Sequence, residues 1–127
     1  MKDEVQSAQT VKGLLQAIVD SGFSFTYFYQ KGGDSSCVYI YRFQKGKDFF
    51  DWRETSGKLE LHFVVYSKGE YRFPALYALY KKQRRKFAFS HLFKKATVDE
   101  ERVFFASLIL AEWDKAQKQK DFFGIAL

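Results

Sequence analysis

Near the N-terminus, apolar residues recur every three or four positions, as on one side of an α-helix. The stripe comprises Val11, Leu14, Leu15, Ile18 and Val19. Thr10 precedes it, and a threonine before an apolar run can cap a helix by accepting a backbone N–H. Gly22 follows, where a helix commonly stops. The pattern therefore predicts an amphipathic helix over residues 11–20 whose apolar side needs a sheet or a second helix to cover it.

Between this helix and Pro74 the hydrophobic period changes to two, which is the period of β-strands. The alternating segments cover residues 23–30, 36–44, 48–55, 58–67 and 70–73. Turns that contain glycine separate them, and glycine supplies the positive φ that tight hairpins need. The simplest arrangement is an antiparallel meander of these strands.

The third and fourth segments also predict a register. A two-residue turn at Ser56-Gly57 fixes the cross-strand neighbours. The predicted pairs are Asp51–His62, Trp52–Leu61 and Arg53–Glu60. One face of the hairpin is then charged, and the other is apolar and carries Phe50, Trp52, Leu59, Leu61, Phe63 and Val65. A slip of one residue would mix the two faces.

The rest of the chain predicts helices. Pro74 suits the first turn of a helix that continues through "PALYALYKKQRRK". Thr97 and Glu100 form a capping-box pattern at the start of a second helix that reaches about Lys118. The tail "DFFGIAL" is too apolar to stay in water, so we expect it to pack back on the domain. The whole is typical of a single α+β domain over residues 1–127, with an N-terminal helix, a five-stranded antiparallel meander sheet and two C-terminal helices packed on the sheet.

Composition adds an unusual aromatic content and removes several chemistries. The chain has 15 Phe, 8 Tyr and 2 Trp, which favours a β-rich core, a sticky surface or both. Cys37 is the single cysteine and cannot form an intramolecular disulfide, and two histidines are too few for a structural zinc site. Residues 1–10 are polar and show no signal-peptide pattern. We therefore expect a cytoplasmic protein without a metal or cofactor.

Charge is the most uneven property of the chain. Residues 81–95 contain seven basic residues and no acid, whereas the whole chain has a net charge of +6, so the other residues sum to −1. The basic residues are Lys81, Lys82, Arg84, Arg85, Lys86, Lys94 and Lys95. On a helix, most of them lie opposite Tyr80 and Phe87, and Tyr77 lies with the basic residues. Phe89 and Phe93 are also interspersed among them.

Single-signed charge beside aromatic rings is what a nucleic-acid site uses, with cations for the phosphates and rings for the bases. A solvated helix face more often mixes both signs, because like charges repel. A solvated face and an acidic patch on a protein partner are nevertheless open alternatives. Anionic lipid is disfavoured, because the apolar side of this helix is expected to be needed for the core.

The aromatic strand face of Tyr39, Tyr41 and Phe43 has two interpretations. Sheets that bind RNA use such a face as a stacking platform. More often, rings on one strand face form core beneath a helix, with the hydroxyl groups reaching the rim. We favour the core.

Asp51, Arg53, Glu60 and His62 form the only cluster with catalytic potential in the predicted register. Two carboxylates beside a histidine could hold a divalent metal or move a proton. Cross-strand ion pairs on a solvent-facing hairpin account for the same residues. No catalytic residue is therefore assigned.

These patterns together predict a small non-catalytic nucleic-acid-binding domain with a basic helix face. The predicted contact residues are Tyr77, Lys81, Lys82, Arg84, Arg85, Lys86, Lys94 and Lys95. The ligand would be DNA or RNA, single strands included, and no membrane contact is expected. The alternative is a protein-interaction module, such as a homodimer through the C-terminal helix and tail. A metal-dependent nuclease-like enzyme comes third.

Overall fold

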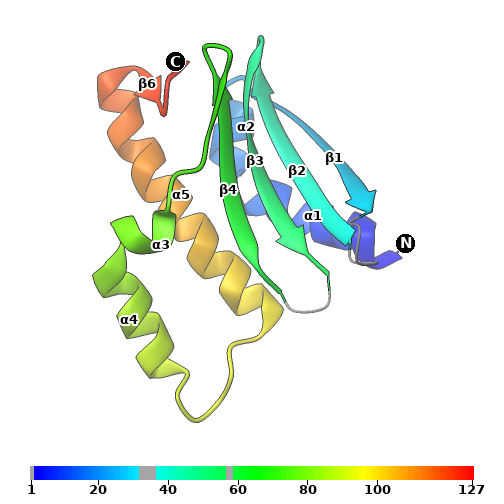
Figure 1. The fold of residues 1–127 in the computed structure, drawn as a ribbon, viewed down its shortest axis with the longest axis vertical. Helices are drawn as coiled ribbons and strands as arrows, with labels where there is room; N and C mark the ends of the chain where they lie inside the picture. The colour runs from blue at the N-terminus through cyan, green and yellow to red at the C-terminus, as the bar shows by residue number, and fades with distance from the viewer. Residues whose placement is uncertain (1, 32–36, 57–58) are drawn as a thin grey trace.

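The computed structural model describes residues 2–31, 37–56 and 59–127, and it has the predicted α+β order (Figure 1). The helices are α1 (Lys2–Leu14), α2 (Gln16–Asp20), α3 (Leu76–Leu79), α4 (Lys81–Ser90) and α5 (Val98–Gln119). The strands are β1 (Ser24–Lys31), β2 (Cys37–Lys45), β3 (Asp48–Thr55), β4 (Leu61–Ser67), β5 (Glu70–Arg72), β6 (Asp121–Phe122) and β7 (Ile125–Ala126). The predicted turn between β1 and β2 and the predicted turn residue Gly57 lie outside the described residues. Within the described ranges, no helix has the length and apolar character needed to cross a bilayer.

Strands β1 to β5 form one antiparallel sheet in sequential order, which confirms the predicted meander. Two of its turns depend on glycine. Gly46 between β2 and β3 has a φ of +64°, and Gly69 between β4 and β5 has a φ of +77°. Both values lie in the left-handed region that side chains with a Cβ avoid.

The predicted register of the middle hairpin is wrong by two residues. Trp52 lies opposite Phe63, Arg53 opposite His62 and Asp51 opposite Val64. The reason is that Thr55 and Glu60 close the hairpin, with Thr55 N–H donating to the Glu60 carbonyl at 3.1 Å. The connection is therefore longer than a two-residue turn. A slip of two keeps every side chain on its predicted face, because side chains alternate with a period of two.

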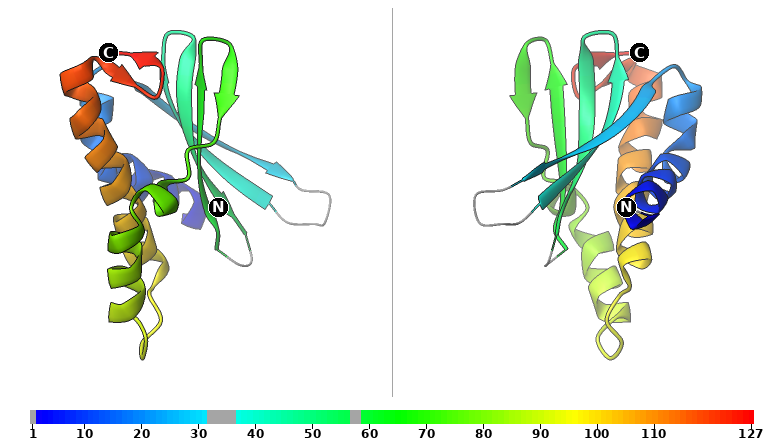
Figure 2. Two further views of the ribbon diagram at one scale, coloured as in Figure 1. Left: turned by 60° about the vertical axis from the view of Figure 1, so that its left-hand side comes forward. Right: turned by 90° about the vertical axis from the view of Figure 1, so that its right-hand side faces the viewer.

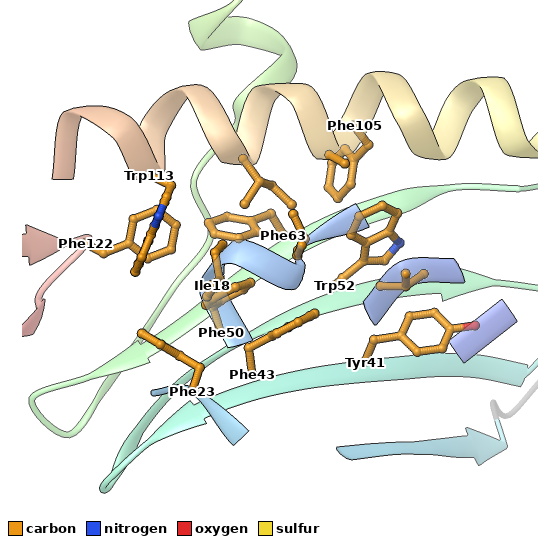
Figure 3. Packing of buried hydrophobic residues seen from close by; sticks show 14 of the residues in the cluster. Ile18, Phe23, Tyr41, Phe43, Phe50, Trp52, Phe63, Phe105, Trp113 and Phe122 are labelled. Atoms are coloured by element: carbon orange, nitrogen blue, oxygen red, sulfur yellow. The ribbon is translucent and has the colours of Figure 1, made fainter. Parts of the chain in front are cut away.

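The apolar face of the sheet is the core, and α1, α2, α5 and the β6–β7 hairpin cover it (Figure 2). Phe43, Phe50 and Trp52 are completely buried there. In Figure 3, Phe105 of α5 meets Trp52 edge to face, with ring centroids 4.9 Å apart. Burial of such large rings is the main favourable term for this sheet–helix packing. Tyr41 is buried with Phe43, so the core interpretation of that strand face is confirmed.

The N-terminal helix begins earlier than predicted. It starts at Lys2, and Thr10 lies inside it with its hydroxyl donating to the Gln6 carbonyl at 3.0 Å, so the predicted Thr10 cap is wrong. Ala8 is buried one turn before Val11, which extends the apolar stripe toward the N-terminus. The helix breaks at Leu15 and resumes as α2, and Gly22 follows with a φ of +121°, as expected of a helix stop.

The helix predicted from Pro74 through Lys86 is two helices. The chain leaves helical geometry at Tyr80, where φ is −116° and ψ is 50°, between α3 and α4. The capping box of α5 is confirmed, since Thr97 accepts from the Glu100 N–H and Glu100 accepts from the Thr97 N–H. The tail packs back as predicted, because Phe122 and Ile125 of the β6–β7 hairpin are each 1% exposed. α5 thus lies along the sheet, while α4 runs beside the first turns of α5 and extends beyond the sheet (Figure 1).

Candidate nucleic-acid interface

The predicted site lies on a helical arm, which we define as α4, the connection 91–97 and the first three turns of α5. Aromatic stacking joins its two helices, with the ring centroids of Phe87 and Phe104 only 4.4 Å apart. Just before α4, the Tyr80 hydroxyl donates to the Glu112 carboxylate farther along α5. None of the α4 residues is fully buried. The arm is therefore held by one side of α4 and leaves the other side in water.

Arg84 and Tyr77 belong to the side of the arm that holds it together. The Arg84 guanidinium lies 4.3 Å from the centre of the Tyr77 ring and 3.4 Å from the Glu101 carboxylate. Burial raises the pKa of Tyr77 to about 12, although the neighbouring Arg84 opposes the shift. The phenol is therefore uncharged at neutral pH. Of the predicted contact residues, these two are tied to α5 rather than directed outward.

The other predicted cations remain in water on the outward side of α4 and on the connection that follows it. We call them the basic face: Lys81, Lys82, Arg85, Lys86, Lys94 and Lys95. All six are exposed, and within the described parts of the chain none has an acidic partner within ion-pair distance. Among the residues that the structure describes, Arg84 is the one Lys or Arg of the basic segment that pairs with an acid. The basic face therefore projects a field of one sign into solvent.

Three apolar side chains stand at the end of the arm beside these cations. Phe89 is 75% exposed, Leu92 62% and Phe93 fully exposed. Phe89 follows Arg85 and Lys86 by one helical turn, so its ring stands on the basic face itself. Sequence reasoning placed Tyr77 there and did not select Phe89. A helical wheel started at Lys81 would have found it, since Phe89 falls between Lys82 and Arg85.

A groove of about 790 Å³ separates the arm from the edge of the sheet. Its floor is apolar and includes Leu61, Phe63 and Phe105. Its charged lining includes the cations Arg84 and Lys95 and the acids Glu60 and Glu101, together with His62. The groove is thus mixed in sign, and Lys95 belongs both to its lining and to the basic face.

His91 fastens the connection to both helices of the arm. Its Nδ1 lies 2.8 Å from the Phe87 carbonyl at the end of α4, and its Nε2 lies 3.1 Å from a Glu100 oxygen. Both ring nitrogens therefore face acceptors, and the Phe87 carbonyl, followed by Glu100, raises the pKa of His91. The Thr97 backbone N–H and then His91 lower the pKa of Glu100 to about 2.

An NMR titration should find His91 with a pKa above its ordinary value, and Glu100→Gln should lower that pKa part of the way, because the Phe87 carbonyl is the larger cause and remains. Because the folded pKa is raised, this histidine stabilises the fold fully below its unfolded pKa of about 6.5. The contribution disappears as the pH rises through the folded value. A wild-type His91 pKa below the ordinary value would mean that the ring is neutral and the arm is fastened in another way.

The charged hairpin face is arranged differently from the prediction. Asp51 is completely buried and faces Arg42 and Arg53, with the Arg42 Nε 2.8 Å and the Arg53 Nη2 3.0 Å from its carboxylate oxygens. It does not meet His62, whose nearest acid is Glu60 at 3.5 Å. Among the described residues, no group of three or more His, Cys, Asp or Glu is placed to hold a metal ion. The residues that sequence reasoning gathered as one cluster are thus split into two pairings.

No family model, curated protein or solved structure matches this chain.

Proposed function

We propose that this protein binds nucleic acid without catalysing a reaction and that the basic face of α4 contacts the phosphates. The observation that supports this most is the absence, among the described residues, of any acid paired with the six cations of that face. Phosphate oxygens would supply the missing negative charge. Arg84 and Tyr77 would act indirectly, by holding α4 against α5.

The energetics favour a polyanion over a merely solvated helix. Arg85 and Lys86 lie within one turn of Lys81 and Lys82, and like charges at this spacing destabilise a helix by a few tenths of a kcal/mol per pair. α5 shows the ordinary alternative, because it places acids in its first turn and a lysine in its last. α4 has no acid in either turn. The attraction of each cation to a bound polyanion would offset the repulsion between the cations.

The test is binding of labelled oligonucleotides by fluorescence anisotropy at several salt concentrations. If all six cations contact a single strand, log Kd should change with log salt with a slope of magnitude about 4. Changing Lys81, Lys82, Arg85 and Lys86 to Gln should weaken binding about 100- to 1,000-fold near 0.1 M salt and reduce that slope to about 1. The matched control changes Lys31, Lys47, Lys68 and Lys118 to Gln, which removes the same charge from exposed positions away from the arm.

The control variant should bind nearly as well as the wild type. Equal losses in both variants would show that net charge, and not the basic face, drives binding. Binding that ignores salt would overturn the proposal outright, since phosphate contacts release counterions.

The alternative of a protein-interaction module has its own observation in the structure. Val103 is 56% exposed on α5 and borders an apolar pocket that includes Phe87 and Phe104. The tail, which sequence reasoning also offered as a dimer contact, buries Phe122 and Ile125 in its own domain. Tight self-association by sedimentation, with no affinity for oligonucleotides, would favour this alternative.

A further inference from the structure

We infer that the nucleic acid is single-stranded and that Phe89 and Phe93 stack on its unpaired bases. This inference rests on the proposed function and specifies its ligand. Phe89 and Phe93, the exposed rings toward the end of the arm, have no role in phosphate binding alone.

Phe89 is presented to solvent from the middle of the basic face. Two residues earlier, Phe87 stacks on Phe104 and also touches the His91 ring. Phe89 is rotated by about 200° from Phe87 around α4, so it points away from α5. It contacts no other ring within the described residues, and it is 75% exposed. A flat, open ring one turn from Arg85 and Lys86 can accept a base while those cations hold the adjoining phosphates.

Phe93 offers a second ring of the same kind. It lies in the connection after α4, immediately before Lys94 and Lys95, and its side chain is fully exposed. Leaving a phenyl ring in water forgoes the roughly 1.5–3 kcal/mol that its burial would supply. A single exposed apolar residue is ordinary, but Phe89, Leu92 and Phe93 are three exposed apolar residues within five positions of the chain. We call these three residues the patch, since grouped exposed apolar residues mark interaction sites.

A single strand can contact both the cations and the exposed aromatic rings of this surface, whereas a duplex can contact only the cations. In a duplex the faces of the bases are stacked on one another, so only phosphates and groove edges are accessible. In a single strand the faces are open, and aromatic side chains beside cations bind them with little sequence preference. Along the chain the two rings come after Arg85 and Lys86 and before Lys94 and Lys95, an order of cations and rings that suits a single strand.

The same patch could be read as a membrane anchor, and the charges of the arm argue against that. Asp99 and Glu100 begin α5 directly after the connection, and the Asp99 side chain is 78% exposed. Insertion of the whole end of the arm would bring these carboxylates to anionic headgroups. A strand lying on the outward side of α4 can reach Phe89 without approaching them.

The experiment replaces the rings without removing their apolar character. The double variant Phe89→Leu, Phe93→Leu keeps hydrophobic side chains that can enter a bilayer but lacks the flat π face that stacks on a base. Leu92→Ala is the matched control, since it trims the same patch without touching a ring. All three side chains are exposed, so neither variant should unfold the domain.

Anisotropy is measured with a labelled mixed-sequence 20-mer, as a single strand and as a duplex, in DNA and RNA forms. The wild type should bind the single strand more tightly than the duplex. The double Leu variant should weaken single-strand binding about tenfold or more and leave duplex binding unchanged, because each stacked base is worth a factor of roughly 5 to 150. Leu92→Ala should change neither.

The failures of the two proposals are distinguishable. If the wild type binds neither oligonucleotide, the proposed function fails, and the inference fails with it. If it binds both forms equally and the double Leu variant changes nothing, the inference alone fails. Binding to phosphatidylserine vesicles that survives the double Leu change and is lost in Leu92→Ala would assign the patch to a membrane surface and overturn stacking.

Discussion

Replacing Glu54 by alanine should lower the free energy of unfolding by about 3–5 kcal/mol, because it would strand a buried charge. Glu54 is only 3% exposed and accepts two hydrogen bonds from Arg102, at 2.9 and 2.8 Å. It also accepts from the Trp52 indole N–H at 2.9 Å. Alanine would therefore leave a guanidinium and an indole donor without their partner in the interior.

Urea denaturation of Glu54→Ala, Arg102→Met and the double variant would measure this. The double variant should recover much of the loss, because replacing a buried ion pair by apolar groups removes both charges from the interior together. The coupling between the two positions should be several times the 0.2–1 kcal/mol or so that is typical of an exposed pair. A single-variant loss below about 1 kcal/mol would show that water and the remaining partners of Arg102, Ser7 and Asp99, compensate its charge.

The Glu54–Arg102 pair also fixes where the arm leaves the sheet. Arg102 is on the second turn of α5, and its Nη2 also donates to the Ser7 hydroxyl of α1 at 3.1 Å. One side chain thus joins β3, α1 and α5 at the root of the arm. Loss of the pair should loosen the arm before it unfolds the sheet, and weaker oligonucleotide binding at mild urea concentrations would report this.

Sequence patterns predicted the five strands of the sheet because the alternation that marks each strand lies within its own segment. Alternation continues to a glycine-containing turn, and Gly46 and Gly69 have the positive φ that these turns require. Register was not a local signal. It depends on the closure of the hairpin by Thr55 and Glu60, and nothing in the alternation distinguishes that closure from a shorter turn. Both choices bury the same faces.

The candidate site was predictable to the extent that it depends on charge count. A segment of seven cations without an acid identifies α4, which carries five of them, and the connection after it from sequence alone. Which of them is free depends on packing, since Arg84 turns toward Glu101 while Arg85 faces water. Packing also determines which aromatic rings are free. Tyr77, before the break of helical geometry at Tyr80, packs against Phe104, whereas Phe89, on α4 after the break, lies on the basic face.

The Glu54–Arg102 pair was missed because each residue resembles a surface residue in its own segment. Glu54 is the last residue but one of β3, and Arg102 follows three acids in the first turn of α5. Only the packing of α5 over Trp52 brings them together. Long-range pairing of charges of this kind has no periodic signature.

Replacing Asp51 by alanine should also destabilise the fold strongly, by about 2–4 kcal/mol, rather than abolish a reaction. Asp51 is completely buried on the sheet face that no helix covers among the described residues, and it accepts three hydrogen bonds, two from Arg42 and one from Arg53. The Arg42 guanidinium also lies 3.8 Å from the centre of the Phe49 ring. Alanine would leave two arginines facing each other over a row of apolar side chains. The expected loss is below that for Glu54, because both arginines are partly exposed and water can compensate them.

Thermal or urea denaturation measures that loss, and Asp51→Asn serves as the comparison, since the amide oxygen still accepts from one arginine while the charge is gone. Asn should lie between wild type and alanine in stability. Oligonucleotide affinity at low temperature, where each variant is folded, should not change, because Asp51 is bonded to Arg42 and Arg53 of the sheet and to no residue of the basic face. If Asp51→Ala kept its stability but lost an Mg²⁺- or Mn²⁺-dependent nuclease activity, the carboxylate would be a functional group and the uncovered sheet face an active site. The three short hydrogen bonds from Arg42 and Arg53 argue that Asp51→Ala lowers stability and removes no catalytic activity, because they occupy both carboxylate oxygens that a metal would need.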